Sequence, residues 1–203
     1  MRADQELFTT RRPAEEYFEL INQMWNAMGK HLRRFQGTHG KHVGDGLVYY
    51  FLPWPEGNYL SNAIQCAISM RSTMREISDE WSNRKGWLNG LKLNIGLDEG
   101  EEWFGSYQTP TQIEISALGD TINRTSRLSD FARDGTIWVT KNMISKLPEE
   151  DRCKVSFRIH HQSENEEAFV AHSYARISNL VNLSNPENKK LSDIATLAVT
   201  KII

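Results

Sequence analysis

The sequence predicts an α+β fold in which helices and short strands surround one sheet. Two observations favour this class. Two long segments repeat apolar residues at helical spacing, and several short apolar runs lie between turns rich in glycine and proline. The 203 residues suit one domain, and 39% hydrophobic residues suffice for its core. We expect one folded domain over residues 1–178 and a C-terminal tail or linker over residues 179–203.

Both long helices are predicted from their apolar stripes. The first starts at Pro13, and Glu15 and Glu16 then lie near the positive end of its dipole. Its stripe consists of Phe18, Ile21, Trp25, Met28, Leu32 and Phe35. The stripe of the second consists of Leu60, Ala63, Ala67, Met70, Met74, Ile77 and Trp81. Stripes at this spacing predict faces that pack against the core.

The remaining elements are shorter. Strands are expected at residues 41–43, 47–51, 91–97, 113–115, 136–140, 155–159 and 169–174. The first two of these strands flank Gly44-Asp45-Gly46, a strong signal for a hairpin. A short helix is expected at residues 121–131, capped by Asp120, and another at residues 141–147. This order of elements favours one sheet with helices packed against it.

Composition excludes several classes of function. The formal net charge of −2 gives no basic excess for a nucleic-acid partner. No apolar run is long enough to span a bilayer, and the N-terminus lacks the pattern of a signal peptide. Cys66 and Cys153 form neither a disulfide framework nor a metal-binding pattern. We therefore expect a cytoplasmic protein that has no membrane segment and no nucleic-acid partner.

Three stretches carry candidate chemistry. Asp45, in the hairpin turn, offers a carboxylate on rigid backbone to a cation such as Mg²⁺, although Asp-Gly is also an ordinary turn. In residues 118–127, Asn123 and Arg127 share a helical face and could hold a ribose oxygen and a phosphate oxygen. The alternative is a capped surface helix with a solvated arginine. Residues 94–100 indicate only that the backbone needs room at a glycine.

Together these stretches resemble the class III adenylyl and guanylyl cyclase domain. That family carries K-x-I-G-D, R-I-G-I-H-x-G and G-D-T-V-N-x-x-S-R motifs. Residues 41–45, 94–100 and 119–127 match them in the same order. The resemblance covers residues 4–175 and implies a ferredoxin-like βαββαβ core and a head-to-tail homodimer. In such a dimer one subunit supplies the metal carboxylates and the other supplies the base, ribose and phosphate contacts.

The resemblance implies a role for each matching residue. Asp45 matches one metal ligand, and Asp4 matches the other in a D-x-x-x-F-T spacing that lacks the family's isoleucine and glycine. Lys41 and Ser116 occupy the two positions that read the purine, and their identities favour ATP. Asn123 and Arg127 match the pair that stabilises the transition state.

The implied activity is that of an adenylate cyclase. Two Mg²⁺ or Mn²⁺ ions would assist attack of the ribose 3′-oxygen of ATP on the α-phosphorus, releasing cyclic AMP and pyrophosphate.

Three departures qualify this expectation. Only three residues precede Asp4, so the first strand of the family is expected to be absent, or this chain starts late relative to the natural protein. The late phosphate lysine of the family has no counterpart in residues 159–169, and Asn94 replaces an arginine. A catalytically inactive cyclase-like domain that binds nucleotide or regulates through dimerisation therefore remains an alternative. The other alternative is an unrelated α+β domain whose motifs match by chance.

Overall fold

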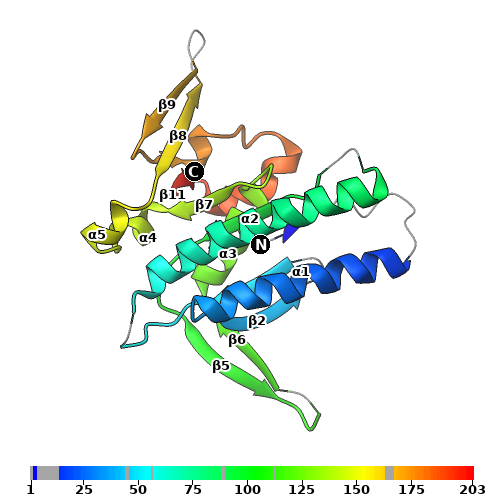
Figure 1. Cartoon of the computed structure of the whole chain (residues 1–203). Helices are drawn as coiled ribbons and strands as arrows, with labels where there is room; N and C mark the ends of the chain where they lie inside the picture. The colour runs from blue at the N-terminus through cyan, green and yellow to red at the C-terminus, as the bar shows by residue number, and fades with distance from the viewer. Residues whose placement is uncertain are drawn as a thin grey trace.

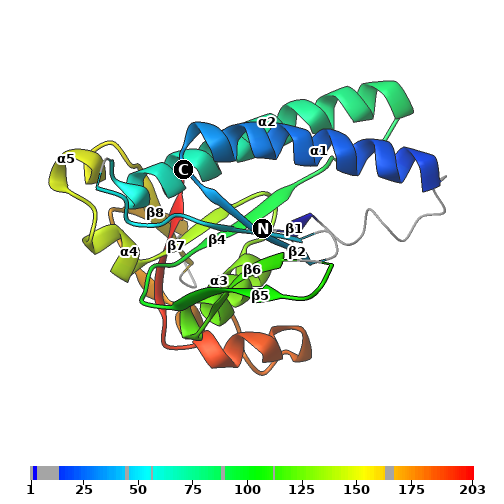
Figure 2. The same cartoon turned by 90° about the horizontal axis from the view of Figure 1, so that it is seen from below.

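The computed structural model describes residues 2–3, 14–43, 46–55, 57–87, 90–111, 113–162 and 167–203. The described chain has three layers (Figure 2). On one side of the sheet lie helices α1 (Ala14–Arg34) and α2 (Tyr59–Lys85). On the other side lie α3 (Asp120–Phe131) and the 3₁₀ segment η3 (Pro186–Ile194). The predicted α+β class is confirmed.

The described residues form a main sheet of seven strands. Its order is β1 (Arg2–Ala3), β4 (Leu93–Leu97), β7 (Ile137–Thr140), β11 (Ala198–Ile202), β8 (Phe157–Gln162) and β9 (Glu167–Ala171), and β10 (Ala175–Arg176) also pairs with β11. The β4–β7 pair is parallel and the other pairs are antiparallel. Central strands β4, β7 and β11 are mostly buried because both faces of the sheet are covered.

Two expectations about the ends of the chain need correction. The first strand, expected to be absent unless this chain starts late relative to the natural protein, is present as the two residues of β1, which pair with Leu93 and Asn94. Residues 198–202, expected in a tail or linker, form β11 in the middle of the sheet, between β7 and β8.

Two hairpins lie outside the main sheet. One consists of β2 (Thr38–Val43) and β3 (Gly46–Tyr50), and β3 contacts β1. The other consists of β5 (Trp103–Gln108) and β6 (Ile113–Leu118) and projects from the body of the molecule (Figure 1). We call this second hairpin the β5–β6 arm. Because β2 also contacts β6, the two hairpins are neighbours.

The two long helices pack together over the sheet. All seven residues of the predicted α2 stripe are buried, as expected. In the α1 stripe Ile21, Met28 and Leu32 are buried, but Phe18 is exposed and its predicted core role is wrong. Helix α2 begins after Asn58, whose side chain accepts hydrogen bonds from the Leu60 and Ser61 amides, and ends at Gly86.

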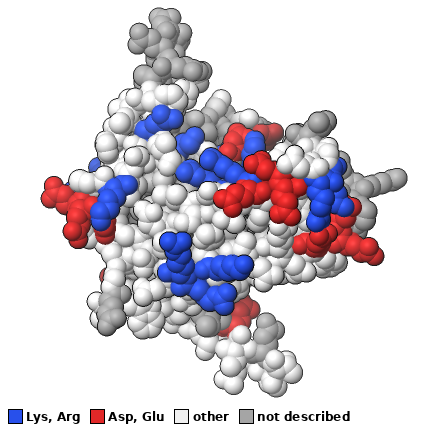
Figure 3. All heavy atoms as spheres, in the orientation of Figure 1, with Lys and Arg blue, Asp and Glu red and all other residues white. Residues whose placement is uncertain are grey.

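Ion pairs join the N-terminal part of α1 to the C-terminal end of α2. Arg84 pairs with Glu19 and Lys85 pairs with Glu16. Figure 3 shows acidic and basic side chains side by side where the start of α1 meets the end of α2. Within the described ranges, no helix combines the length and the apolar character that crossing a bilayer requires.

The shorter helices complete the fold. Helices α4 (Lys141–Ser145) and α5 (Glu149–Arg152) follow β7, and the 3₁₀ turn η2 (Ile177–Asn179) follows β10. Helix α3 begins at Asp120, and its N-cap is Gly119, so the predicted capping by the Asp120 side chain is wrong. A second cluster of buried residues, including Leu128, Ile177 and Ile194, packs α3 against the C-terminal segment.

Candidate active site

Four of the predicted site residues lie in described parts of the chain. Lys41 is on β2, Ser116 is on β6, and Asn123 and Arg127 are on α3. Asp4 and Asp45, the predicted metal ligands, lie outside the described residues. The described residues contain no group of three or more His, Cys, Asp or Glu side chains that could hold a metal ion. The predicted metal site therefore stays a prediction.

The two predicted purine-reading residues come from adjacent strands. Strand β2, with Lys41, contacts strand β6, with the buried Ser116. A third residue fixes the two hairpins to each other. The Tyr50 hydroxyl of β3 accepts a hydrogen bond of 3.3 Å from the Ala117 amide, and its ring meets Phe104 edge-on at 5.1 Å. The backbone that carries Ser116 is thereby held against the hairpin that carries Lys41.

Helix α3 lies directly on strand β4 at Gly96. A Cβ atom at Gly96 would lie 2.5 Å from the Ser129 amide nitrogen and 2.7 Å from the Thr125 carbonyl oxygen. Such distances leave no space for any side chain. Residues 94–100 were predicted to contain a glycine at a position where the backbone needs room. Gly96 is such a glycine, because it lets α3 approach β4 closely.

A buried ionic network fixes the first turns of α3. The side chain of Asp98, which follows β4, is only 1% exposed. It accepts hydrogen bonds from Arg124 Nε at 2.7 Å, from the Thr140 hydroxyl at 2.7 Å and from the Glu99 amide at 2.9 Å. Arg124 also donates to the Thr121 hydroxyl at 3.2 Å. The network joins α3 to the ends of β4 and β7.

Sequence analysis did not identify this network. Both partners lie inside two of the matching stretches, Asp98 one residue after a buried strand and Arg124 next to Asn123. A carboxylate that directly follows a buried strand is a signal that could have singled out Asp98. Its partner could not be found in this way, because the two are 26 residues apart.

Asn123 and Arg127 both lie on α3, as predicted. Asn123 is exposed. Arg127 NH1 lies 3.7 Å from a carboxylate oxygen of Asp130, and Arg127 Nε lies 3.8 Å from one of Asp193 in η3. These contacts are long and partly exposed, so the guanidinium can exchange them for another anion at little cost.

A carboxylate lies at the N-terminus of the same helix. Glu102 accepts a hydrogen bond from the Thr121 amide, in the first turn of α3. The other carboxylate oxygen of Glu102 is buried and has no partner among the described residues. Negative charge at this end stabilises a helix dipole. The Thr121 amide in the first turn of α3 is therefore already engaged by an acidic residue of the chain.

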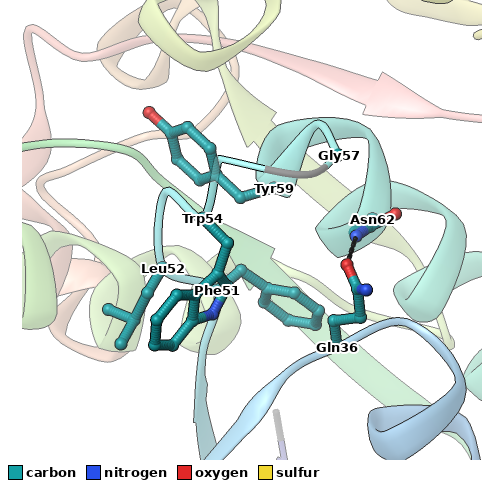
Figure 4. A pocket seen from close by; sticks show the side chains of 7 residues that line it. All are labelled: Gln36, Phe51, Leu52, Trp54, Gly57, Tyr59 and Asn62. Atoms are coloured by element: carbon teal, nitrogen blue, oxygen red, sulfur yellow. Dashed lines mark hydrogen bonds between the residues drawn. The ribbon is translucent and has the colours of Figure 1, made fainter.

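A shallow pocket lies elsewhere, between the end of β3 and the start of α2 (Figure 4). Three of its seven lining residues are aromatic, and a hydrogen bond of 3.2 Å between Gln36 and Asn62 lies at one side. The lining residues are Gln36, Phe51, Leu52, Trp54, Gly57, Tyr59 and Asn62. None of the four predicted site residues that the structure describes lines it, so this pocket is separate from Lys41, Ser116, Asn123 and Arg127.

Comparison with known sequences relates this chain to adenylate and guanylate cyclases. The model of the adenylate and guanylate cyclase catalytic domain matches residues 3–170. An adenylate cyclase of Anabaena cylindrica is 26% identical over 148 residues, which are 71% of this chain and 28% of that protein. Adenylate cyclase 1 of Rhizobium meliloti (strain 1021) is 21% identical over 124 residues, which are 61% of this chain and 18% of that protein. The chain thus spans less than a third of the length of these curated relatives.

Solved structures share the fold. The adenylyl cyclase CyaB from P. aeruginosa superposes with a TM-score of 0.70 at 18% identity, covering 100% of this chain and 90% of that one. The guanylyl cyclase Cya2 gives a TM-score of 0.69 at 16% identity, covering 98% and 88%. The predicted cyclase-type fold is confirmed. Since the family model matches most of the sequence, this chain belongs to the adenylate and guanylate cyclase catalytic domain family.

Proposed function

We propose that this chain is an adenylate cyclase, which converts ATP to cyclic AMP and pyrophosphate. The observation that carries the choice of ATP is the contact between β2 and β6, which brings the strands of Lys41 and Ser116 together. Lys41 has no ion-pair partner among the described residues, so its ammonium group is available to a ligand. A lysine donates to the adenine N1 acceptor, and a serine hydroxyl accepts from the adenine amino group.

We assign the phosphate and ribose contacts to two residues of α3. Arg127 exchanges its long contacts with Asp130 and Asp193 for the α-phosphate, where its guanidinium stabilises developing negative charge. Asn123, one turn earlier, holds the ribose so that its 3′-oxygen faces the phosphorus. Because Glu102 already engages the Thr121 amide and places negative charge at the start of α3, we assign the phosphate contact to the Arg127 side chain and not to this end of the helix.

The proposed metal ligands are Asp4 and Asp45. Strand β1 ends at Ala3 and strand β3 begins at Gly46, and these two strands are in contact. The residues that flank the two aspartates therefore belong to neighbouring strands. Carboxylates suit Mg²⁺ or Mn²⁺, and two such ions, when bound, neutralise phosphate charge and make the 3′-oxygen a better nucleophile.

The preference for ATP over GTP is tested by replacing both proposed purine-reading residues. Lys41→Glu together with Ser116→Cys should lower the ratio of kcat/KM for ATP to that for GTP by at least about tenfold, because Glu accepts from the guanine N1–H group and Lys only donates. The assay measures both cyclic nucleotides from both substrates. Lys30→Glu, the same charge change at an exposed position on α1, is the control.

An active double variant that keeps the original ratio would show that Lys41 and Ser116 do not read the base. If the unchanged protein binds ATP but forms no cyclic product with Mn²⁺, the chain is a nucleotide-binding regulatory module and the proposed activity is wrong.

We further propose a homodimer whose active sites lie at the interface. The β5–β6 arm supports it. Trp103, Tyr107 and Leu118 are exposed and project from the same face of the arm, since Trp103 and Leu118 pair directly and Tyr107 is four residues along the strand. A cluster of large apolar side chains on a projecting hairpin favours contact with another protein surface.

A mixing experiment tests this arrangement. Asp45→Asn damages the proposed metal half of a site, and Arg127→Ala damages the proposed phosphate half. Each variant alone should be nearly inactive, whereas an equal mixture should recover about a quarter of wild-type activity, because half of the dimers carry one intact site of two. Cyclic AMP formation is measured against mixing ratio at fixed total protein. No recovery, despite proven exchange of subunits, would place the whole site within one chain.

A further inference from the structure

Strand β2 carries two histidines whose rings face each other. A hydrogen bond of 2.8 Å joins the Nε2 atoms of His39 and His42, and the ring centroids are 4.7 Å apart. Residues three apart on a regular strand point to opposite faces. Here the β2–β3 register shifts between His39 and His42, and a bulge of this kind turns both side chains to the same side. The backbone irregularity therefore creates the histidine pair.

The ring of His39 is oriented by the backbone. Its Nδ1 atom lies 3.1 Å from the Gly40 carbonyl oxygen, which can only accept a hydrogen bond. This contact assigns the proton to Nδ1 and leaves the lone pair of the neutral ring on Nε2, where it accepts the hydrogen bond from His42 Nε2–H. A metal that takes this lone pair would replace that hydrogen bond, with the His42 proton moving to its Nδ1 atom. A ring N–H that donates to a backbone carbonyl is the arrangement that commonly orients a metal-binding histidine.

The ring of His42 is fixed by packing. It lies against the Trp25 ring with centroids 4.1 Å apart. Burial, and then the nearby His39, lower the pKa of His42, so its neutral form is favoured. Only neutral imidazole has a lone pair for a metal. Both histidines are nevertheless exposed enough for an ion to reach them.

We propose that His39 and His42 form a binding site for a divalent late first-row transition metal, with water at its other positions. Two nitrogens about 2.1 Å from a metal lie about 3.0 Å apart at a right angle and about 3.4 Å apart at the tetrahedral angle. The observed 2.8 Å is the length of a hydrogen bond between the rings, so both nitrogens already lie close to the separation that one ion requires. Imidazole suits late first-row ions such as Ni²⁺, Cu²⁺ and Zn²⁺.

This site is distinct from the proposed carboxylate site. Imidazole prefers softer ions than Mg²⁺, which takes oxygen ligands. Because Lys41 lies between the two histidines, a bound metal would fix the strand segment that carries it. That consequence for ATP binding depends on the proposed function, whereas the metal site itself does not.

The test is a calorimetric titration of the full chain with Ni²⁺ near pH 7.5. The protein carries no affinity tag and is first treated with a chelator. We expect one Ni²⁺ per chain. His39→Gln and His42→Gln should each lower the affinity at least tenfold, and the double variant should not bind. Ni²⁺ should raise Tm for the wild type and not for the double variant. His160→Gln on β8 is the matched control and should bind like the wild type.

Two results would overturn the proposal. One is a wild-type protein that does not bind Ni²⁺, and the other is a double variant that folds and binds it as tightly as the wild type does. If the variants do not fold, Cu²⁺ electron paramagnetic resonance on the wild type decides. Coupling to two nitrogens supports the site, and its absence rules the site out. Neither measurement depends on cyclase activity.

Discussion

The burial of tryptophan side chains differs between the body of the molecule and the β5–β6 arm. Trp81 on α2 is 0% exposed, and its indole N–H donates to Gln23 at 2.6 Å. Trp103 on β5 is 85% exposed, and every residue of β5 is exposed. Trp81 thus has both its apolar and its polar contacts within one chain. Trp103 does not, and its exposure favours the proposed contact of the arm with a second molecule.

The largest expected effect compares the two tryptophans directly. Trp81→Ala should lower the free energy of unfolding by about 3–5 kcal/mol, because it leaves a cavity in the core. Trp103→Ala should change it by less than about 0.5 kcal/mol, because the side chain makes little contact within the chain. Urea unfolding at a protein concentration that favours the monomer measures both. Equal losses would mean that the arm packs on its own chain.

A smaller effect is expected from the buried ionic network. Arg124→Met should destabilise the chain by about 2–3 kcal/mol, because it leaves the Asp98 carboxylate buried without its cation. Arg133→Met, an exposed change just after α3, serves as the control and should be close to neutral. Thermal and urea unfolding measure both variants. A neutral Arg124→Met would show that Asp98 is satisfied by its hydrogen bonds from Thr140 and Glu99 alone.

A substitution on the β5–β6 arm should have the smallest effect on folding but a clear effect on dimerisation. Trp103→Ser should raise the dimer dissociation constant at least about tenfold, since exposed aromatic residues often dominate interfaces. Its Tm as a monomer should stay unchanged. Analytical ultracentrifugation over a range of concentrations gives the constant, and Phe18→Ser on α1 is a control at another exposed aromatic position. Equal dimerisation of wild type and Trp103→Ser would remove the arm from the proposed interface.

Local patterns predicted the helices well, and tertiary context decided the rest. The α2 stripe was correct at each position because helical periodicity alone sets which residues share a face. The stripe of α1 failed at Phe18 because periodicity does not give the width of the buried face. Strand β11 was missed because its five residues carry little pattern, and its partners in β7 and β8 are far away in the sequence.

In the candidate site, too, local spacing predicted some features, and others depend on tertiary packing. The placement of Asn123 and Arg127 on one helix followed from their spacing. The contact of Arg127 with Asp193 did not, because it depends on how η3 packs against α3. Nor could the bulge that brings His39 and His42 together be predicted, since it depends on how β2 pairs with β3.

The position of β11 also constrains the order of events during synthesis. The ribosome makes residues 198–202 after every other described strand, yet β11 fills the place between β7 and β8. Until β11 emerges, β7 and β8 each present an unpaired edge, and such edges invite pairing with other chains. The sheet can therefore be completed only after residues 198–202 have been made, by joining segments distant in sequence, which is a slow type of folding step. Nascent chains of this protein should therefore benefit from protection of these two edges until β11 is in place.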